Sequence, residues 1–265
     1  MLRNLFFKSL RDMRVSVFWW CLGFVVLSLY ITYFYPYFSR TTDILTVIDQ
    51  LPPIVKNLIG EQVNLATPEG FFNVQPFSMM APLLFLIFAI VKAGDGIAGE
   101  IERGTFDLLC SLPLRRWRIV MEKMAALAVS LSVIAVVFWL GMIAGVRWFS
   151  ISMSPMRLGE AIFSCWLLAL TFATLTQAIT CRWQRKRPVM GVVSGYAMMA
   201  YLVNAYAPMV KVLEPYRGLS LFYYYNGSSP LINGLNPGHV LVMAGLTGCF
   251  FMASILLFQR ADLSG

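Results

Sequence analysis

Six long apolar runs constrain this chain of 265 residues more than any other feature. A helix needs roughly 20 apolar residues to cross the hydrocarbon core of a bilayer. The runs that reach this length lie at about 15–35, 77–98, 125–148, 158–181, 189–207 and 240–258. Inside lipid every backbone polar group must be hydrogen-bonded within the protein, so such runs form helices. The sequence therefore predicts an all-α membrane protein with six transmembrane helices.

The composition leaves little material for a soluble domain. Apolar residues make up 58% of the chain and charged residues 13%, whereas soluble domains carry about 25% charged residues. The mean hydropathy is +0.70. The longest segments between spans, about 37–76 and 208–239, are short. We therefore expect one transmembrane domain over residues 1–265 and no separate soluble domain. Glycine, proline and asparagine in 208–239 predict turns, and part of this segment could re-enter the membrane.

The distribution of basic residues predicts the orientation. If the N-terminus is inside, 15 of the 21 Lys and Arg residues fall in the inner segments 1–14, 92–123, 182–187 and 259–265. Cytoplasmic loops are enriched in Lys and Arg, so both termini are expected to be cytoplasmic. Basic loops that face anionic lipid account for the net charge of +8. The charge therefore gives no reason to expect a nucleic-acid partner.

The first 14 residues alternate at helical spacing. One face would carry Leu2, Leu5, Phe6, Leu10 and Met13, and the other Arg3, Lys8, Arg11 and Arg14. This pattern predicts an amphipathic helix that lies along the inner leaflet. The alternative is a merely charged flank before the first span.

The inner segment between the second and third spans combines charge, glycine and a proline-terminated helix. A charged cluster of Glu100, Glu102 and Arg103 precedes a break at Gly104. Thr105 is a suitable N-cap for a short helix, and Pro113 ends it because proline disfavours helix in the residue before it. The short helix is predicted over 106–112.

One side of that short helix is apolar in an otherwise charged loop. Phe106, Leu109 and Cys110 share this side, and Leu112 closes the helix. Arg115 and Arg116 follow as an inner anchor for the third span. Such a loop is suited to binding another protein on the cytoplasmic side.

A second basic turn lies between the fourth and fifth spans. It contains Arg182, Arg185, Lys186 and Arg187. This turn is either a topology anchor or a second docking contact for the same partner.

Two spans carry a G-x-x-x-G pattern, Gly141/Gly145 in the third and Gly191/Gly195 in the fifth. Small residues four apart let helix backbones approach closely in lipid. Each pattern is a candidate contact face, although glycine is common in spans generally.

Motifs for catalysis are missing from the sequence. The string Gly94-x-Gly96-x-x-Gly99 follows a membrane span and not a strand of a βαβ unit, so it does not indicate a dinucleotide site. There is no P-loop, no G-x-S-x-G, no cysteine pair with zinc spacing, and a single histidine, His239. We therefore expect no catalytic site, metal site or bound cofactor. Acidic residues deep in the spans are almost absent, which disfavours a secondary carrier or an intramembrane enzyme.

The run from residue 97 to 123 resembles the inner-loop signature of the type-2 permeases of ATP-binding-cassette (ABC) exporters. The matching residues are Ile97-Ala98, Glu100-Ile101-Glu102-Arg103, Gly104-Thr105, Asp107-Leu108-Leu109, Leu112-Pro113, Arg115-Arg116-Trp117 and Lys123. The six spans, the amphipathic N-terminus and the Thr67-Pro68-Glu69-Gly70 approach to the second span agree with this resemblance.

The resemblance implies one half of a permease dimer in the cytoplasmic (inner) membrane of a prokaryote. The second permease subunit would be identical, and two copies of a separate ABC ATPase would bind ATP and Mg. The helix at 106–112 would be the coupling helix, seated on the ATPase. An alternative is an ATP-driven membrane subunit that transmits force or assembles a complex without passing a substrate.

In this family the second and fifth spans tend to line the central cavity. Here the candidate lining residues are Ser78, Met79, Met80, Tyr196, Met199 and Asn204. Methionine and aromatic side chains make an adaptable apolar wall, which would suit a hydrophobic substrate. The alternative role of these residues is ordinary helix packing.

Overall fold

The computed structural model describes residues 5–40, 67–102, 104, 116–207, 210, 214–227 and 229–260, and all regular elements in this part of the chain are helices. The long helices are α1 (Leu5–Arg40), α5 (Ala81–Glu102), α7 (Arg116–Trp148), α8 (Pro155–Trp183), α9 (Lys186–Tyr206) and α11 (Pro237–Arg260). Six helical runs are long and apolar enough to cross a membrane, and each coincides with a predicted span. The prediction of an all-α membrane protein with six transmembrane helices is confirmed.

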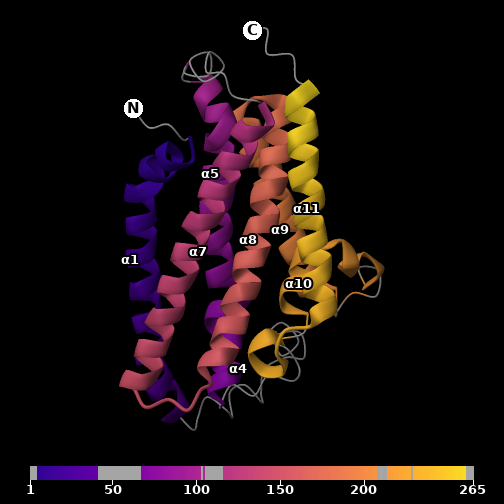
Figure 1. The fold of residues 1–265 in the computed structure, drawn as a ribbon. Helices are drawn as coiled ribbons and strands as arrows, with labels where there is room; N and C mark the ends of the chain where they lie inside the picture. Colours follow the sequence, from indigo (N-terminus) through magenta and orange to yellow (C-terminus); the bar gives the residue numbers. More distant parts are fainter. Residues whose placement is uncertain are drawn as a thin grey trace.

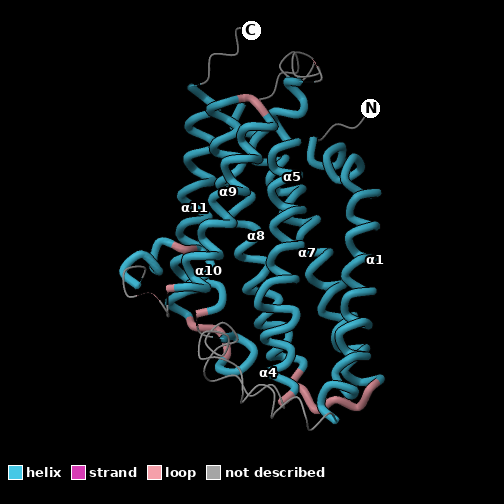
Figure 2. The backbone as a smooth tube through the Cα atoms, turned by 180° about the vertical axis from the view of Figure 1, so that it is seen from behind, coloured by secondary structure: helices cyan, strands magenta, loops and turns pink. Residues whose placement is uncertain are grey.

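The helices form one bundle around α8. This helix contacts α5, α7, α9 and α11. Of the residues in its most apolar stretch of 18, 72% are buried. Figure 1 and Figure 2 show α1 at one edge of the bundle, beside α7, and α11 at the opposite edge. The described N- and C-terminal ends lie at the same end of the bundle, as an even number of crossings requires (Figure 1).

The amphipathic N-terminal segment is not a separate helix. From Leu5 onward it continues without a break into the first span, since no glycine or proline lies between residues 5 and 22. Figure 1 shows its first turns bent toward the neighbouring helices. Two contacts hold them on α7: Leu5 packs on Ile119, and the backbone N–H of Phe6 donates to Glu122 over 3.0 Å.

The second span is built from three consecutive helical pieces. They are α4 (Pro68–Phe72), the π-helix η1 (Asn73–Met80) and α5. Thr67 caps the start, because its hydroxyl accepts a hydrogen bond from the Gly70 N–H over 3.2 Å. The run ends at Glu102. At 1.5 Å per residue it is about 50 Å long, so it extends beyond the hydrocarbon core.

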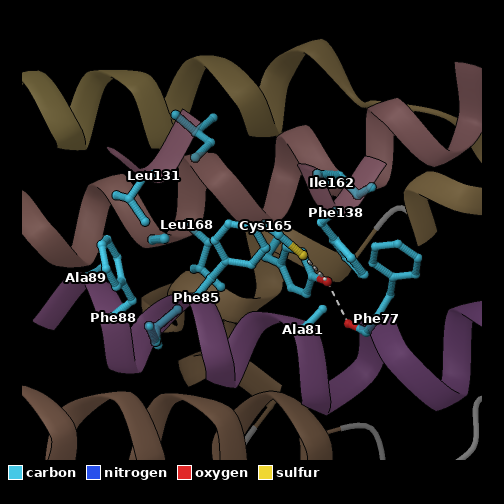
Figure 3. Packing of buried hydrophobic residues seen from close by; sticks show 14 of the residues in the cluster. Phe77, Ala81, Phe85, Phe88, Ala89, Leu131, Phe138, Ile162, Cys165 and Leu168 are labelled. Atoms are coloured by element: carbon cyan, nitrogen blue, oxygen red, sulfur yellow. Dashed lines mark hydrogen bonds between the residues drawn. The ribbon is translucent and has the colours of Figure 1, made fainter. Parts of the chain in front are cut away.

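The core is rich in phenylalanine. Figure 3 shows Phe77, Phe85 and Phe88 of the second span beside Phe138 of α7. The ring of Phe24 lies 4.7 Å from that of Phe85 and 4.9 Å from that of Phe138. All three side chains are almost fully buried. Aromatic pairs at these distances add about 0.5–1.5 kcal/mol each beyond the area that they bury.

The two G-x-x-x-G patterns differ in what they meet. Gly141 and Gly145 lie against α1: a Cβ on Gly141 would come 3.0 Å from the Ser28 hydroxyl, and one on Gly145 would come 2.8 Å from the Thr32 methyl. The third-span pattern is therefore a real contact face. Around Gly191 and Gly195, by contrast, the described residues leave open space.

The segment between α9 and α11 folds back into the bundle. It contains the 3-10 helix η2 (Glu214–Leu219), the short helix α10 (Leu221–Asn226) and the π-helix η3 (Ser229–Asn233). α10 packs against α8, α9 and α11, and it buries Leu221, Phe222 and Tyr225. The chain therefore enters the bundle again before the sixth span begins.

Candidate functional site

The C-terminal end of α5 and the N-terminal end of α7 flank the predicted docking loop, and a buried ion pair joins them. The ammonium of Lys123 on α7 lies 3.2 Å from the carboxylate of Glu100 on α5 and also donates to the Gly96 carbonyl. The Lys123 side chain is only 8% exposed. Lys8 of α1 lies 3.9 Å from the same Glu100 carboxylate. Three helices therefore meet at one carboxylate directly before the loop.

A second set of contacts joins α5 to the start of α9. Lys186 pairs with Asp95 through its side chain, and its backbone N–H donates to the Glu102 carboxylate over 3.0 Å. Glu100 and Asp95 lie five residues apart, and they bind partners on different helices. The last two turns of α5 are thus connected by ionic contacts to α1, α7 and α9.

The predicted docking residues fall partly inside the described chain. Glu100 and Glu102 lie on α5, and both make contacts within this chain. Gly104 follows the helix with φ at 68°, and its N–H donates to the Ile101 carbonyl, the left-handed ending that glycine favours. Arg116 begins α7. The remaining predicted residues lie outside the described ranges: Arg103, Thr105, Phe106, Leu109, Leu112, Pro113 and Arg115.

The basic turn between α8 and α9 lies at the same end of the bundle, where Lys186 contacts α5. Gln184 ends α8 in the left-handed conformation, with φ at 54°. Arg182, Arg185 and Arg187 are exposed, whereas Lys186 is held by Asp95. Three of the four predicted docking residues of this turn therefore present their charge to the surroundings.

An apolar groove of about 210 Å³ runs between α5 and α9. Its wall on α9 is a stripe at helical spacing, and its wall on α5 has the same periodicity; the lining residues are Met79, Leu83, Leu86, Ile87, Ile90, Val91, Met190, Ser194, Ala197, Met198, Tyr201 and Phe222. Residues of the second and fifth spans thus face each other across a groove within this chain, and the predicted lining of a central cavity between two subunits stays a prediction.

Of the six predicted lining residues, Met79 lies in this groove. Met80 and Met199 are exposed on other faces of their helices. The Tyr196 hydroxyl donates to the Leu219 carbonyl over 3.1 Å. Neither Ser78 nor Asn204 is among the residues that line the groove. The α9 wall of the groove follows helical spacing at residues 190, 194, 197 and 201.

One family model matches almost the whole of this chain. A search of curated proteins finds no match. The family model described as "ABC-2 family transporter protein" matches residues 3–263. This match includes all six spans, the loop between α5 and α7 and the segment that folds back between α9 and α11. The chain therefore belongs to the ABC-2 family of transporter proteins.

Proposed function

We propose that this chain is the permease subunit of an ABC exporter, driven by separate ATP-binding subunits that bind its inner loop. The observation that carries this proposal is the set of ionic contacts at the inner end of α5. Glu100 binds Lys123 and Lys8, and Lys186 binds Asp95. A force applied to the loop between α5 and α7 would reach α1, α7 and α9 directly through these contacts.

The ATP-binding subunits, in two copies, would hold ATP and Mg. This chain itself would bind no cofactor or metal and would catalyse no reaction. The exposed arginines of the 182–187 turn would add a second contact with the same subunits. Membrane lipid would surround the rest of the bundle, and no nucleic acid would take part.

A second, identical copy would complete the pathway. Support comes from the exposed face of α9, where Gly191 and Gly195 have open space around them and Val192 and Met199 are exposed. Small residues at such a spacing allow close approach of another helix in lipid. The α5–α9 groove is apolar, which suits a hydrophobic substrate.

The chain would lie in the cytoplasmic membrane of a prokaryote with both termini inside. The basic residues of the inner segments support this orientation. The loop that would bind the ATPase is then on the side where ATP is available.

Purification of the chain from its native membrane tests the proposal. A tagged copy extracted in mild detergent is expected to carry an ABC ATP-binding subunit, and native mass spectrometry is expected to give two copies of each subunit. Recovery of the chain as a monomer without any ATP-binding subunit, in detergents that keep it folded, would argue against the proposal.

A further inference from the structure

The π-helix in the second span leaves one carbonyl group without a backbone donor. The N–H of Ala81 donates to the Pro76 carbonyl, five residues back. In the same register the donor for the Phe77 carbonyl would be residue 82, which is a proline and has no N–H. A buried carbonyl without a hydrogen-bond donor destabilises the folded state, and Phe77 is buried.

Tyr225 of α10 supplies the missing donor. Its hydroxyl donates to the Phe77 carbonyl over 2.6 Å and lies 3.0 Å from the Cys165 sulfur on α8, as the dashed lines between Cys165 and Phe77 in Figure 3 show. The Ser164 hydroxyl donates to the Tyr225 carbonyl over 3.0 Å. Tyr225 is 2% exposed. One buried hydroxyl thus joins α10 to the irregular part of the second span.

α10 also lies across the outer end of the α5–α9 groove. Phe222 lines the groove together with Met79 and Tyr201, and its ring lies 5.5 Å from that of Tyr201. On the α9 side, the Ser220 hydroxyl donates to the Ala200 carbonyl over 2.6 Å. The start of α10 is therefore bound to α9, and its end is bound to the second span.

We infer that Tyr225 is a positioning residue that holds the outer end of the groove closed, and that the groove opens outward when its hydroxyl leaves the Phe77 carbonyl. The π-helix provides the alternative state. If the helix shifts to the ordinary register, the N–H of Ala81 donates to Phe77 and replaces Tyr225. Helical segments with a π register occur frequently at functional sites.

Release of Tyr225 separates α10 from the second span while Ser220 keeps its start on α9. The outer end of the groove then widens between α5 and α9, and Phe222 moves with α9. That this opening passes a substrate rests on the proposed function. The link between Tyr225 and Phe77 does not depend on it.

Cys165 reports the opening, because it is fully buried beside Tyr225. The test is the rate at which N-ethylmaleimide labels Cys165 in purified chain, measured by mass spectrometry. Cys181 is equally buried on α8, about 24 Å away along the helix at 1.5 Å per residue, and it serves as the internal reference. The Tyr225→Phe variant removes one oxygen and keeps the ring.

Tyr225→Phe is expected to raise the Cys165 labelling rate about tenfold relative to Cys181, since a lost buried hydrogen bond shifts a local opening by about that factor. Tyr224→Phe, the matched control, should leave the ratio unchanged. Hydrogen exchange of the Asn73–Met80 amides should rise in Tyr225→Phe as well, which excludes a purely local effect on the thiol. An unchanged Cys165 labelling ratio, or a raised ratio without a rise in this exchange, would overturn the inference.

The wild-type complex gives a separate readout that does not need a variant. Addition of MgATP to the chain with its ATP-binding subunit is expected to change Cys165 labelling relative to Cys181. If Tyr225→Phe raises Cys165 labelling but MgATP has no effect, the inferred role of the contact between Tyr225 and Phe77 is supported. The proposed ATP-driven function is then contradicted. If neither changes labelling, the inference is wrong whatever the function.

Discussion

Replacing Leu109 by aspartate is expected to reduce the amount of ATP-binding subunit that remains bound to this chain at least tenfold. Leu109 shares an apolar side of the predicted coupling helix with Phe106. A carboxylate on this side would have to be buried against the partner without a counter-charge, which is strongly unfavourable. The measurement is the ratio of ATP-binding subunit to tagged chain after purification, with the ATPase rate of the remaining complex.

Two further variants separate docking from a general effect of charge. Ser111→Asp adds the same charge to the loop away from the apolar side and should leave binding near the wild-type level. Phe106→Ala removes packing area without adding charge, so it should weaken the coupling of ATP hydrolysis while the fold stays intact. Wild-type binding and hydrolysis in both Leu109→Asp and Phe106→Ala would show that this helix does not couple the subunits.

The second large effect is expected at the ion pair between Glu100 and Lys123. Glu100→Gln removes the carboxylate beside the ammonium of Lys123, whose side chain is 8% exposed. Loss of one partner from a buried ion pair typically costs about 3–5 kcal/mol, which corresponds to a fall in unfolding midpoint of about 10 °C for a chain of this size. Tryptophan fluorescence during heating in detergent measures this midpoint, because the chain has seven tryptophans.

The double variant Glu100→Gln/Lys123→Met provides the decisive comparison. It removes both charges, so it should be more stable than Glu100→Gln alone. Arg118→Met serves as the control, since its pair with Glu122 is 48% exposed on the arginine side, and exposed pairs contribute at most about 1 kcal/mol. If Glu100→Gln and Arg118→Met were equally mild, the inner end of α5 would not be held by this pair.

The spans could be predicted from sequence because their cause is local. Twenty apolar residues in lipid form a helix whatever their neighbours are. The helix ends could not be placed from hydropathy, because α5 and α7 continue through charged residues such as Glu100 and Lys123. Their charges are paired between helices, and such pairing is a property of the tertiary structure.

The candidate site, too, could be predicted from the sequence only in part. The contact face at Gly141 and Gly145 was predictable from residue size and spacing, but its partner on α1 was not. Residue type alone does not give the rotation of α9 about its axis, which places Ser194 in the groove and leaves Met199 exposed outside it. The contact between Tyr225 and Phe77 joins residues 148 positions apart, and Pro82 was its one local sign.

A photo-cross-linking amino acid placed at residue 106, in the intact membrane, tests the central claim most directly. The account predicts a cross-link from this position to an ATP-binding subunit on the cytoplasmic side, and none from the same amino acid at Leu219 in the segment between α9 and α11. A residue 106 that cross-links only to lipid or solvent in the intact assembly, or that a membrane-impermeant reagent reaches from the outer side, would contradict the account.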